Sequence, residues 1–439
     1  MKSKLFVIFL LSSAIIFGQA RKIEFTEYDL DNGLHVILHK DNSTPIVAVS
    51  IMYHVGSKNE DPVRTGFAHF FEHLMFEGSD NIPRGQFDKI MESAGGTNNA
   101  NTTQDRTYYY EILPSNQLEL GLWIESERLL HAKIDTIGVE TQRKVVKEEK
   151  KQRYENQPYG SILEETFKRA YKVHPYKWLP IGSAQYIDQA TIDEFRDFYK
   201  TFYVPQNATL VIAGDIDVKK TQSLIKKYFQ DIPKSVKAVP RPEVTEPPLA
   251  GEIKDTVYDN IQLPLVLQAY RIPKIGTEDY YALEMLTTLL SSGESSRLQK
   301  AVVDQKQKAV NVGAFPFSLE DSGLFIAYGI SNRGVSADEL EAAMQEELDK
   351  SINEKISEKE FQKLRNQIEN DFVSGNSTVA GIAGNLATYH VLYGNTNLIN
   401  SEINNYMKVT IDDIQNVAKK YLTKENRVVL YYLPKSAQH

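Results

Sequence analysis

The sequence predicts an α+β protein built from two homologous α/β domains, and three observations lead to this fold class. The chain has 439 residues, of which 41% are hydrophobic, and this is more than one ordinary core requires. The helix-start pattern Thr-Ile-Asp-Glu at 191–194 returns as Thr-Ile-Asp-Asp at 410–413, an offset of 219 residues, and the apolar strands at 210–212 and 429–431 share that offset. Five prolines in a polar stretch from 233 to 248 lie between the two copies. A helix-then-strand unit thus recurs in register.

These features give the expected domain boundaries. Residues 1–20 read as a cleavable secretory signal, because two lysines precede an uncharged run at 5–17 and small residues follow it. An uncleaved membrane anchor is the alternative, but the apolar run is short for a bilayer span. We expect an N-terminal domain at 21–232, a Pro-rich linker at 233–250 and a homologous C-terminal domain at 251–439.

The composition excludes several classes of function. The chain contains no cysteine, which removes disulfides, thiolate metal ligands, a cysteine nucleophile and a lipid-carrying cysteine. Loss of two lysines with the signal takes the formal charge from −8 to −10, because 48 basic residues then face 58 acidic ones. A nucleic-acid partner and an anionic membrane surface are therefore disfavoured, and no membrane insertion is expected after signal cleavage.

The N-terminal domain is expected to open with a β-hairpin. Apolar and polar residues alternate over 22–30 and again over 34–39, and Asp-Asn-Gly at 31–33 is a tight-turn signal between them. The second strand of this hairpin contains His35 and His39. Both are expected to be structural strand histidines rather than ligands.

The next elements carry the most informative motif of the chain. An apolar strand at 46–54 and a polar loop lead to a helix that begins near residue 65, and this helix contains His69, Glu72 and His73. Residues four apart share a helical face, so both imidazoles can reach one Zn²⁺ while Glu72 points toward a coordinated water. The order His-x-x-Glu-His is that of an inverse zincin.

A second helical pattern, from 137 to about 154, contains the adjacent acids Glu148 and Glu149. At about 100° per residue, Glu149 projects onto the apolar seam between Val145 and Val146, and Glu148 lies about a third of a turn away. An inward carboxylate needs a cation. Helix geometry leaves two partners open, a metal ion or a neighbouring Lys or Arg.

The stretch from 66 to 78, Gly-Phe-Ala-His-Phe-Phe-Glu-His-Leu-Met-Phe-Glu-Gly, resembles the pitrilysin/insulinase-type peptidases, a family that includes the mitochondrial processing peptidase. The resemblance implies a third zinc ligand, a glutamate about 76 residues beyond the second histidine. In this chain 149 − 73 = 76, so the implied zinc ligands are His69, His73 and Glu149, with Glu72 as general base. It also implies paired domains, each a mainly antiparallel sheet packed against helices, around an enclosed chamber.

A Gly/Asn-rich segment at 95–103, followed by three tyrosines at 108–110, resembles the family's substrate-binding edge strand. An unpaired strand edge can add an extended peptide. The resemblance therefore implies that the main chain of Asn99, Ala100, Asn101 and Thr102 binds substrate. An ordinary Gly/Asn turn into an aromatic strand is the alternative.

The second half lacks a His-x-x-Glu-His pattern, and its one internal histidine is His390, so one Zn²⁺ per chain is expected. In the family, the C-terminal domain often supplies an arginine and a tyrosine that stabilise the oxyanion. Here Val303 and Val310 occupy those two places. The departure predicts a heterodimer with a homologous subunit that supplies the Arg-Tyr pair. Arg297 could substitute, in which case a homodimer would suffice.

The sequence as a whole predicts a periplasmic or secreted zinc metalloendopeptidase that hydrolyses peptides or unfolded segments, with Glu72 activating the zinc-bound water. The alternative is a non-catalytic binding or scaffold subunit of a processing-peptidase-like complex. A P-loop enzyme is disfavoured, because Gly-Glu-Ser-Ser at 293–296 lacks the spacing and the lysine of that motif.

Overall fold

The computed structural model describes residues 22–437, so the expected signal peptide lies outside the described residues. The N-terminal half forms a six-stranded sheet in the order β1-β2-β6-β3-β5-β4. Its strands are β1 Thr26–Asp29, β2 His35–Lys40, β3 Ile46–Tyr53, β4 Thr97–Thr102, β5 Thr107–Pro114 and β6 Ala208–Gly214. The expected hairpin is present as the antiparallel pair β1–β2, and β2–β6 is the parallel pair of this sheet.

The C-terminal half forms a five-stranded sheet in the order β7-β11-β8-β10-β9. Its strands are β7 Ile253–Asp259, β8 Leu265–Ile272, β9 Ala309–Phe317, β10 Gly323–Ser331 and β11 Arg427–Pro434. Here β7–β11 is the parallel pair, and the other pairs are antiparallel. This order repeats β2-β6-β3-β5-β4 of the first sheet, so the predicted fold class of two homologous, mainly antiparallel α/β halves is confirmed.

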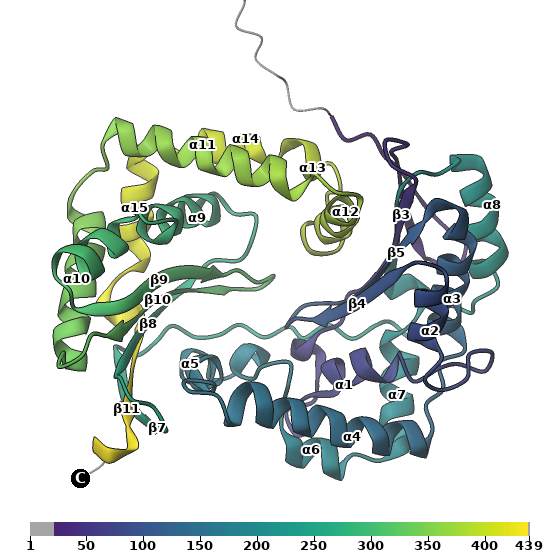
Figure 1. The fold of residues 1–439 in the computed structure, drawn as a ribbon, viewed down its shortest axis with the longest axis horizontal. Coiled ribbons are helices and arrows are strands. Elements are labelled where there is room, and N and C mark those ends of the chain that lie inside the picture. The colour runs from purple at the N-terminus through teal and green to yellow at the C-terminus, as the bar shows by residue number, and fades with distance from the viewer. Residues whose placement is uncertain (1–21, 438–439) are drawn as a thin grey trace, which may run out of the picture.

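Helices surround both sheets (Figure 1). The first half contains α1 Phe67–Leu74, α2 Phe87–Ser93, α3 Leu118–Leu130, α4 Thr136–Lys150, α5 Ile162–Ala170, α6 Ala184–Gln189, α7 Ile192–Phe202 and α8 Val218–Phe229. The second contains α9 Glu278–Ser291, α10 Ala337–Asn353, α11 Glu358–Gly375, α12 Val379–Tyr393, α13 Leu398–Ser401, α14 Ile403–Lys408 and α15 Ile411–Tyr421.

The repeat seen in the sequence corresponds to matching structural units. Thr191 caps α7 in a capping box with Glu194, and Thr410 caps α15 in the same way with Asp413. Each helix then leads into a strand of the parallel pair. The helix α7 leads to β6, which pairs with β2, and α15 leads to β11, which pairs with β7. The shared start pattern therefore encodes the same helix cap in both halves.

Each half also lends one helix to the sheet of the other. The helix α12 packs on β3 and β6 of the first sheet, and α5 packs on β8 and β11 of the second. Figure 1 shows α12 close to β3 and β5, and it shows α5 at the end of the N-terminal half that is turned toward the second sheet. The predicted linker at 233–250 contains no helix or strand. The domain boundaries themselves stay a prediction, because these helices pack across them.

A buried ion-pair cluster joins the two halves near the start of β10. Lys58 is only 4% exposed, and its ammonium lies 3.0 Å from Asp105, 2.6 Å from Glu320 and 3.2 Å from Asp321. The last two residues belong to the loop between β9 and β10. Tyr176 adds a hydrogen bond of 2.6 Å to Asp105. One buried cation thus neutralises carboxylates from both halves.

Candidate metal centre

The helix α1 presents one apolar and one polar face, and this division positions the His-x-x-Glu-His motif. Four apolar side chains, Phe67, Phe70, Phe71 and Leu74, are buried. Their aromatic members stack on the rings of α7, with Phe70 and Phe195 centroids 4.6 Å apart. The opposite face is left for the two histidines and the glutamate of the motif.

The start of α1 is fixed by an unusual cap. Gly66 has φ 103°, a left-handed conformation that favours glycine. The side chain of Glu60 lies against this N-terminal end of the helix. Glu60 is buried and accepts hydrogen bonds from the backbone N–H of Gly66 at 2.9 Å and of Ala68 at 2.8 Å. A carboxylate at a helix N-terminus satisfies otherwise unpaired N–H groups. The register of the motif is therefore set before its first histidine.

The third member of the cluster comes from α4, which packs against α1. Asp135 caps α4 by accepting from the N–H of Gly138, and Val146 is buried one turn before Glu149. The side chain of Glu149 is 16% exposed and faces α1, whereas Glu148 accepts a hydrogen bond from Gln152. Glu149 is thus the acid that points toward the histidines, as predicted, although the predicted apolar seam is only partly present, because Val146 is buried and Val145 is exposed.

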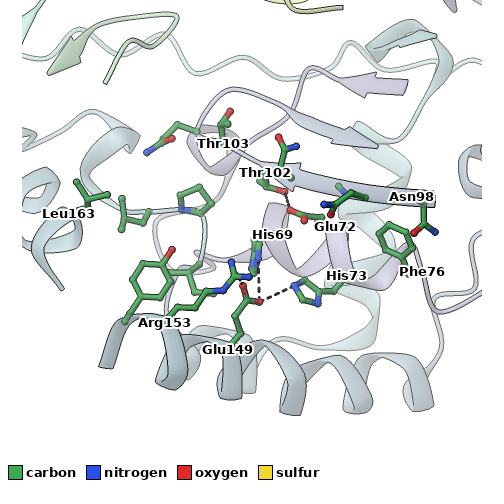
Figure 2. A pocket seen from close by; sticks show the side chains of 18 of the residues that line it. His69, Glu72, His73, Phe76, Asn98, Thr102, Thr103, Glu149, Arg153 and Leu163 are labelled. Atoms are coloured by element: carbon green, nitrogen blue, oxygen red, sulfur yellow. Dashed lines mark hydrogen bonds and ion pairs between the residues drawn. The ribbon is translucent and has the colours of Figure 1, made fainter. Parts of the chain in front are cut away.

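Three donor atoms converge at this place (Figure 2). Glu149 Oε2 lies 3.1 Å from His73 Nε2 and 3.6 Å from His69 Nε2. The other oxygen of Glu149 pairs with Arg153 at 3.0 Å. Of the two partners that the sequence left open, the basic side chain is thus present at one carboxylate oxygen, while the other oxygen faces the two imidazoles.

The donor set fits a zinc ion. Two imidazole nitrogens and a carboxylate oxygen are a known ligand set of catalytic zinc sites, which keep a further position open. The three donor atoms lie within 4.8 Å of one another. Glu149 Oε2 is buried and has no hydrogen-bond donor among the described residues. Because a buried carboxylate oxygen is costly without a donor or a cation, its position favours metal binding.

The electrostatics of the cluster match this arrangement. Burial lowers the pKa of His69 to about 4, so the ring is neutral at physiological pH. The close contact with the His73 ring, 3.1 Å away, lowers the pKa of Glu149, so this carboxyl is ionised. A neutral ring at His69 and an ionised carboxylate at Glu149 are protonation states that metal binding requires.

Glu72 lies beside the cluster without joining it. Its Oε2 accepts a hydrogen bond of 2.6 Å from the hydroxyl of Thr102 on β4. Burial raises the pKa of Glu72, and the Thr102 hydroxyl opposes that shift. Thr102 was expected to act through its main chain, and the structure adds this side-chain contact, for which the sequence offers no local signal.

The strand β4 forms the edge of the first sheet next to this site. It pairs with β5 from Thr97 to Thr102, and no other described strand pairs with its second side. A cavity of about 630 Å³ runs along this edge. Its walls include the motif residues, Asn99, Ala100, Asn101 and Thr102 of β4, and Arg153, Tyr154 and Phe317. Phe317 ends β9, so the C-terminal half contributes to the wall.

The places expected for an Arg-Tyr pair lie outside the cavity wall. Val303 sits in a π-helical turn at Gln299–Gln305, and Val310 is an exposed residue of β9. Arg297 forms an ion pair of 3.1 Å with Glu360 of α11. Its guanidinium is therefore engaged within the C-terminal half.

Sequence reasoning missed Arg153, Tyr154 and Phe317. Arg153 follows Glu149 by four residues, so helical spacing could have identified it as a neighbour. The C-terminal Phe317 carries no such signal, because only the tertiary fold brings it to the site.

The fold and the site together define a class. Two homologous α/β halves, a helix-borne His-x-x-Glu-His motif and an edge strand beside it are the arrangement of an inverse zincin peptidase. The family model described as Insulinase (Peptidase family M16) matches residues 35–178, and the one described as Peptidase M16 inactive domain matches residues 189–368. The chain belongs to the insulinase family of peptidases, family M16.

Named relatives agree with this assignment. The zinc protease PqqE of Helicobacter pylori is 32% identical over 410 residues, which cover 92% of this chain and 92% of that protein. The probable mitochondrial-processing peptidase subunit beta of Arabidopsis thaliana is 23% identical, covering 90% of this chain and 75% of that protein. Among solved structures, a protease from Helicobacter pylori superimposes with a TM-score of 0.91 at 30% identity, over 94% of this chain and all of that one.

Proposed function

We propose that the chain is a zinc metalloendopeptidase in which His69, His73 and Glu149 hold one Zn²⁺ and Glu72 is the general base. The observation that carries this proposal is the convergence of His69 Nε2 and His73 Nε2 on the buried, donor-less Oε2 of Glu149. A bound zinc ion lowers the pKa of water and polarises a peptide carbonyl.

The protein's own residues supply proton transfer and orientation. Glu72 lies on the face of α1 that carries both histidines, and its carboxylate is within reach of a water at the cluster. Thr102 holds one oxygen of Glu72 at 2.6 Å, which leaves the other free to accept a proton and to return it to the leaving amine. This role fits a carboxyl whose pKa burial raises above its ordinary value.

Substrate binding is assigned to the free edge of β4. An extended peptide that pairs with the main chain of Asn99, Ala100, Asn101 and Thr102 would lie directly over Glu72, because the side chain of Thr102 already contacts it. Pairing through main-chain hydrogen bonds depends on an extended peptide backbone and little on the side chains of the substrate. The proposed substrates are therefore peptides or unfolded segments.

A homologous partner subunit is part of the proposal. Preorganised donors to an oxyanion are commonly worth about 3 kcal/mol, and the two family positions hold Val303 and Val310. Arg297 is paired with Glu360, and it would have to give up this contact to serve as the missing donor. A heterodimer with a subunit that carries an Arg-Tyr pair therefore has more support than a homodimer.

The site of action is proposed to be the periplasm or the extracellular space. The support is the signal-like sequence of residues 1–20. No helix within residues 22–437 has the length and apolar character needed to cross a membrane. A solved structure described as the periplasmic protease PqqL of Escherichia coli shares the fold at 20% identity with a TM-score of 0.77.

The test is cleavage of a quenched fluorescent peptide by the zinc-loaded chain, alone and with a co-purified homologous subunit. Glu72→Gln is expected to lower kcat/KM at least about a hundredfold while zinc content stays unchanged. Glu148→Gln is the matched control and is expected to retain activity, because Glu148 is an exposed acid next to Glu149 that points away from the cluster. Equal turnover by wild type and Glu72→Gln would refute the base assignment, and a zinc-free, inactive complex would favour the scaffold function.

A further inference from the structure

A second cluster of side chains that could bind a metal ion lies where the two halves meet. It is on the face of the first sheet opposite to the face that packs against α1. Val36 and Leu38 of β2 belong to the core that contains α1, whereas Ile37 belongs to the cluster that contains α12. Side chains alternate along a strand, so His35 lies on the α12 side with Ile37. There it meets His390, although 355 residues separate the two in sequence (390 − 35).

The contacts of this cluster are close and specific. The rings of His35 and His390 stack with centroids 3.5 Å apart and an interplanar angle of 5°. His35 Nδ1 lies 2.7 Å from Asp29 Oδ1, and its Nε2 lies 3.4 Å from Glu27 Oε2. The hydroxyl of Thr396 donates to that same oxygen at 2.6 Å and lies 3.4 Å from His390 Nδ1.

These contacts determine where the lone pairs point. When His35 is neutral and donates Nδ1–H to Asp29, its Nε2 presents a lone pair to the carboxylate of Glu27. Two electron-rich atoms at that distance need a positive species between them, either a proton or a metal ion. A carboxylate on the far nitrogen of a histidine is also the usual outer partner of a metal-binding imidazole.

A metal ion would engage more of the cluster than a proton. A proton on His35 satisfies that ring and its two carboxylates but gives His390 no partner, whereas a metal ion can take one donor atom from each of Glu27, His35 and His390. Nδ1 of His390 has a long contact of 3.4 Å with the hydroxyl of Thr396. The groups that face the pair from β1, α12 and the following loop are Glu27, Asp29 and Thr396.

We propose that Glu27, His35 and His390 form a second site for a divalent transition-metal ion of the zinc class, which ties α12 to the N-terminal sheet. One donor atom from each residue lies within 4.8 Å of the others. Two ligands of a tetrahedral zinc ion are about 3.3 Å apart, so metal binding requires the donor atoms to move closer and the two rings to leave their parallel stack, which lets their in-plane lone pairs converge. Histidine and carboxylate donors select zinc and similar ions over Ca²⁺ or Mg²⁺.

The site has a structural consequence that the first metal centre does not share. Its ligands come from β1 and β2 of one half and from the exchanged helix of the other, so bound metal crosslinks the halves. Ligand binding to the folded state alone stabilises it by mass action. This proposal replaces the expectation of a single ion per chain, and it is independent of the proposed peptidase activity.

The test starts from an untagged His69→Ala/His73→Ala variant, in which the first centre is removed. Zinc is titrated into the metal-free protein by calorimetry, and Co²⁺ is added in parallel to record the visible spectrum. We expect one ion per chain, a Co²⁺ spectrum with nitrogen ligation, and a rise in Tm with zinc. Adding His390→Ala is expected to weaken binding at least about tenfold and to abolish the rise in Tm.

His131→Ala is the matched control, because that histidine lies on the surface near Asp80, away from the cluster. Glu27→Gln is a milder second variant at an exposed position, should His390→Ala fail to fold. No zinc binding to the His69→Ala/His73→Ala protein would overturn the proposal. Binding that survives both His390→Ala and Glu27→Gln would also overturn it, because the ion would then lie elsewhere.

Discussion

The two halves of the molecule share one strand order but differ in what the α-helix after one central strand carries, the strand being β3 in the first half and β8 in the second. In the N-terminal half, β3 leads to α1 with His69, Glu72 and His73. In the C-terminal half, β8 leads to α9, which contains no histidine. The fold therefore does not create the metal centre, which depends on a few side chains placed on one copy of a repeated scaffold.

The C-terminal half nevertheless takes part in the site. It supplies Phe317 to the cavity wall, and its helix α12 covers the face of the first sheet that is opposite to α1 (Figure 1). The first half returns α5 to the second sheet. The two copies have thus diverged in chemistry while staying mutually dependent in packing.

The largest effect is expected from removing a metal ligand from the N-terminal half. Glu149→Gln weakens a carboxylate ligand and leaves a buried amide against two imidazoles, so we expect zinc content and peptide cleavage to fall at least about a hundredfold. Zinc is measured by mass spectrometry after gel filtration. Glu148→Gln, one residue earlier and pointing away, should bind zinc like wild type, and equal loss in both variants would contradict the assignment.

The next largest effect concerns the ion-pair cluster between the halves. Lys58→Ala leaves Asp105 buried without its cation, which is expected to cost about 3–5 kcal/mol of unfolding free energy. Urea unfolding followed by circular dichroism measures this change. The exposed Lys219→Ala on α8 is the control, and a similar small effect for both lysines would show that the cluster does not hold the halves together.

The exchanged helix provides a third test. Leu386 on α12 is fully buried against the first sheet, and Leu386→Ala is expected to cost about 2–5 kcal/mol. Because α12 and α5 cross between the halves, unfolding should remain a single transition. Calorimetry of wild type, Leu386→Ala and the half-buried Leu392→Ala checks this, and two separate transitions would mean that the halves are independent.

The smallest effect depends on pH. Burial by itself raises the pKa of Asp321, but its contacts with His174 and Lys58 lower it to about 2. A lowered carboxyl pKa stabilises the fold above the unfolded value near 4, and the contribution is lost as the pH falls toward 2. After allowance for its 38% exposure, Asp321→Asn should cost about 1 kcal/mol at pH 7 and almost nothing at pH 2. Urea midpoints at several pH values measure this, and a pH-independent difference would contradict it.

Much of this organisation could be predicted from local patterns. Alternation and a tight turn gave the β1–β2 hairpin, helical spacing placed His69 and His73 on one face, and the apolar seam selected Glu149 over Glu148. The 219-residue repeat predicted the paired halves. Each of these rests on contacts between residues close in sequence or on a repeated pattern.

The remainder depends on contacts that no local pattern encodes. The exchange of α5 and α12 is decided by packing between the halves, and the approach of His390 to His35 follows from that exchange. Phe317 reaches the cavity wall for the same reason. The metal-binding and catalytic roles of the site residues themselves stay predictions that geometry supports.

The most direct test of the difference between the halves is anomalous diffraction at the zinc absorption edge from crystals grown with zinc. The account predicts a strong peak about 2.0–2.2 Å from His69 Nε2, His73 Nε2 and Glu149 Oε2, and none against α9 in the C-terminal half. A zinc-containing crystal with no peak between those three side chains would contradict it.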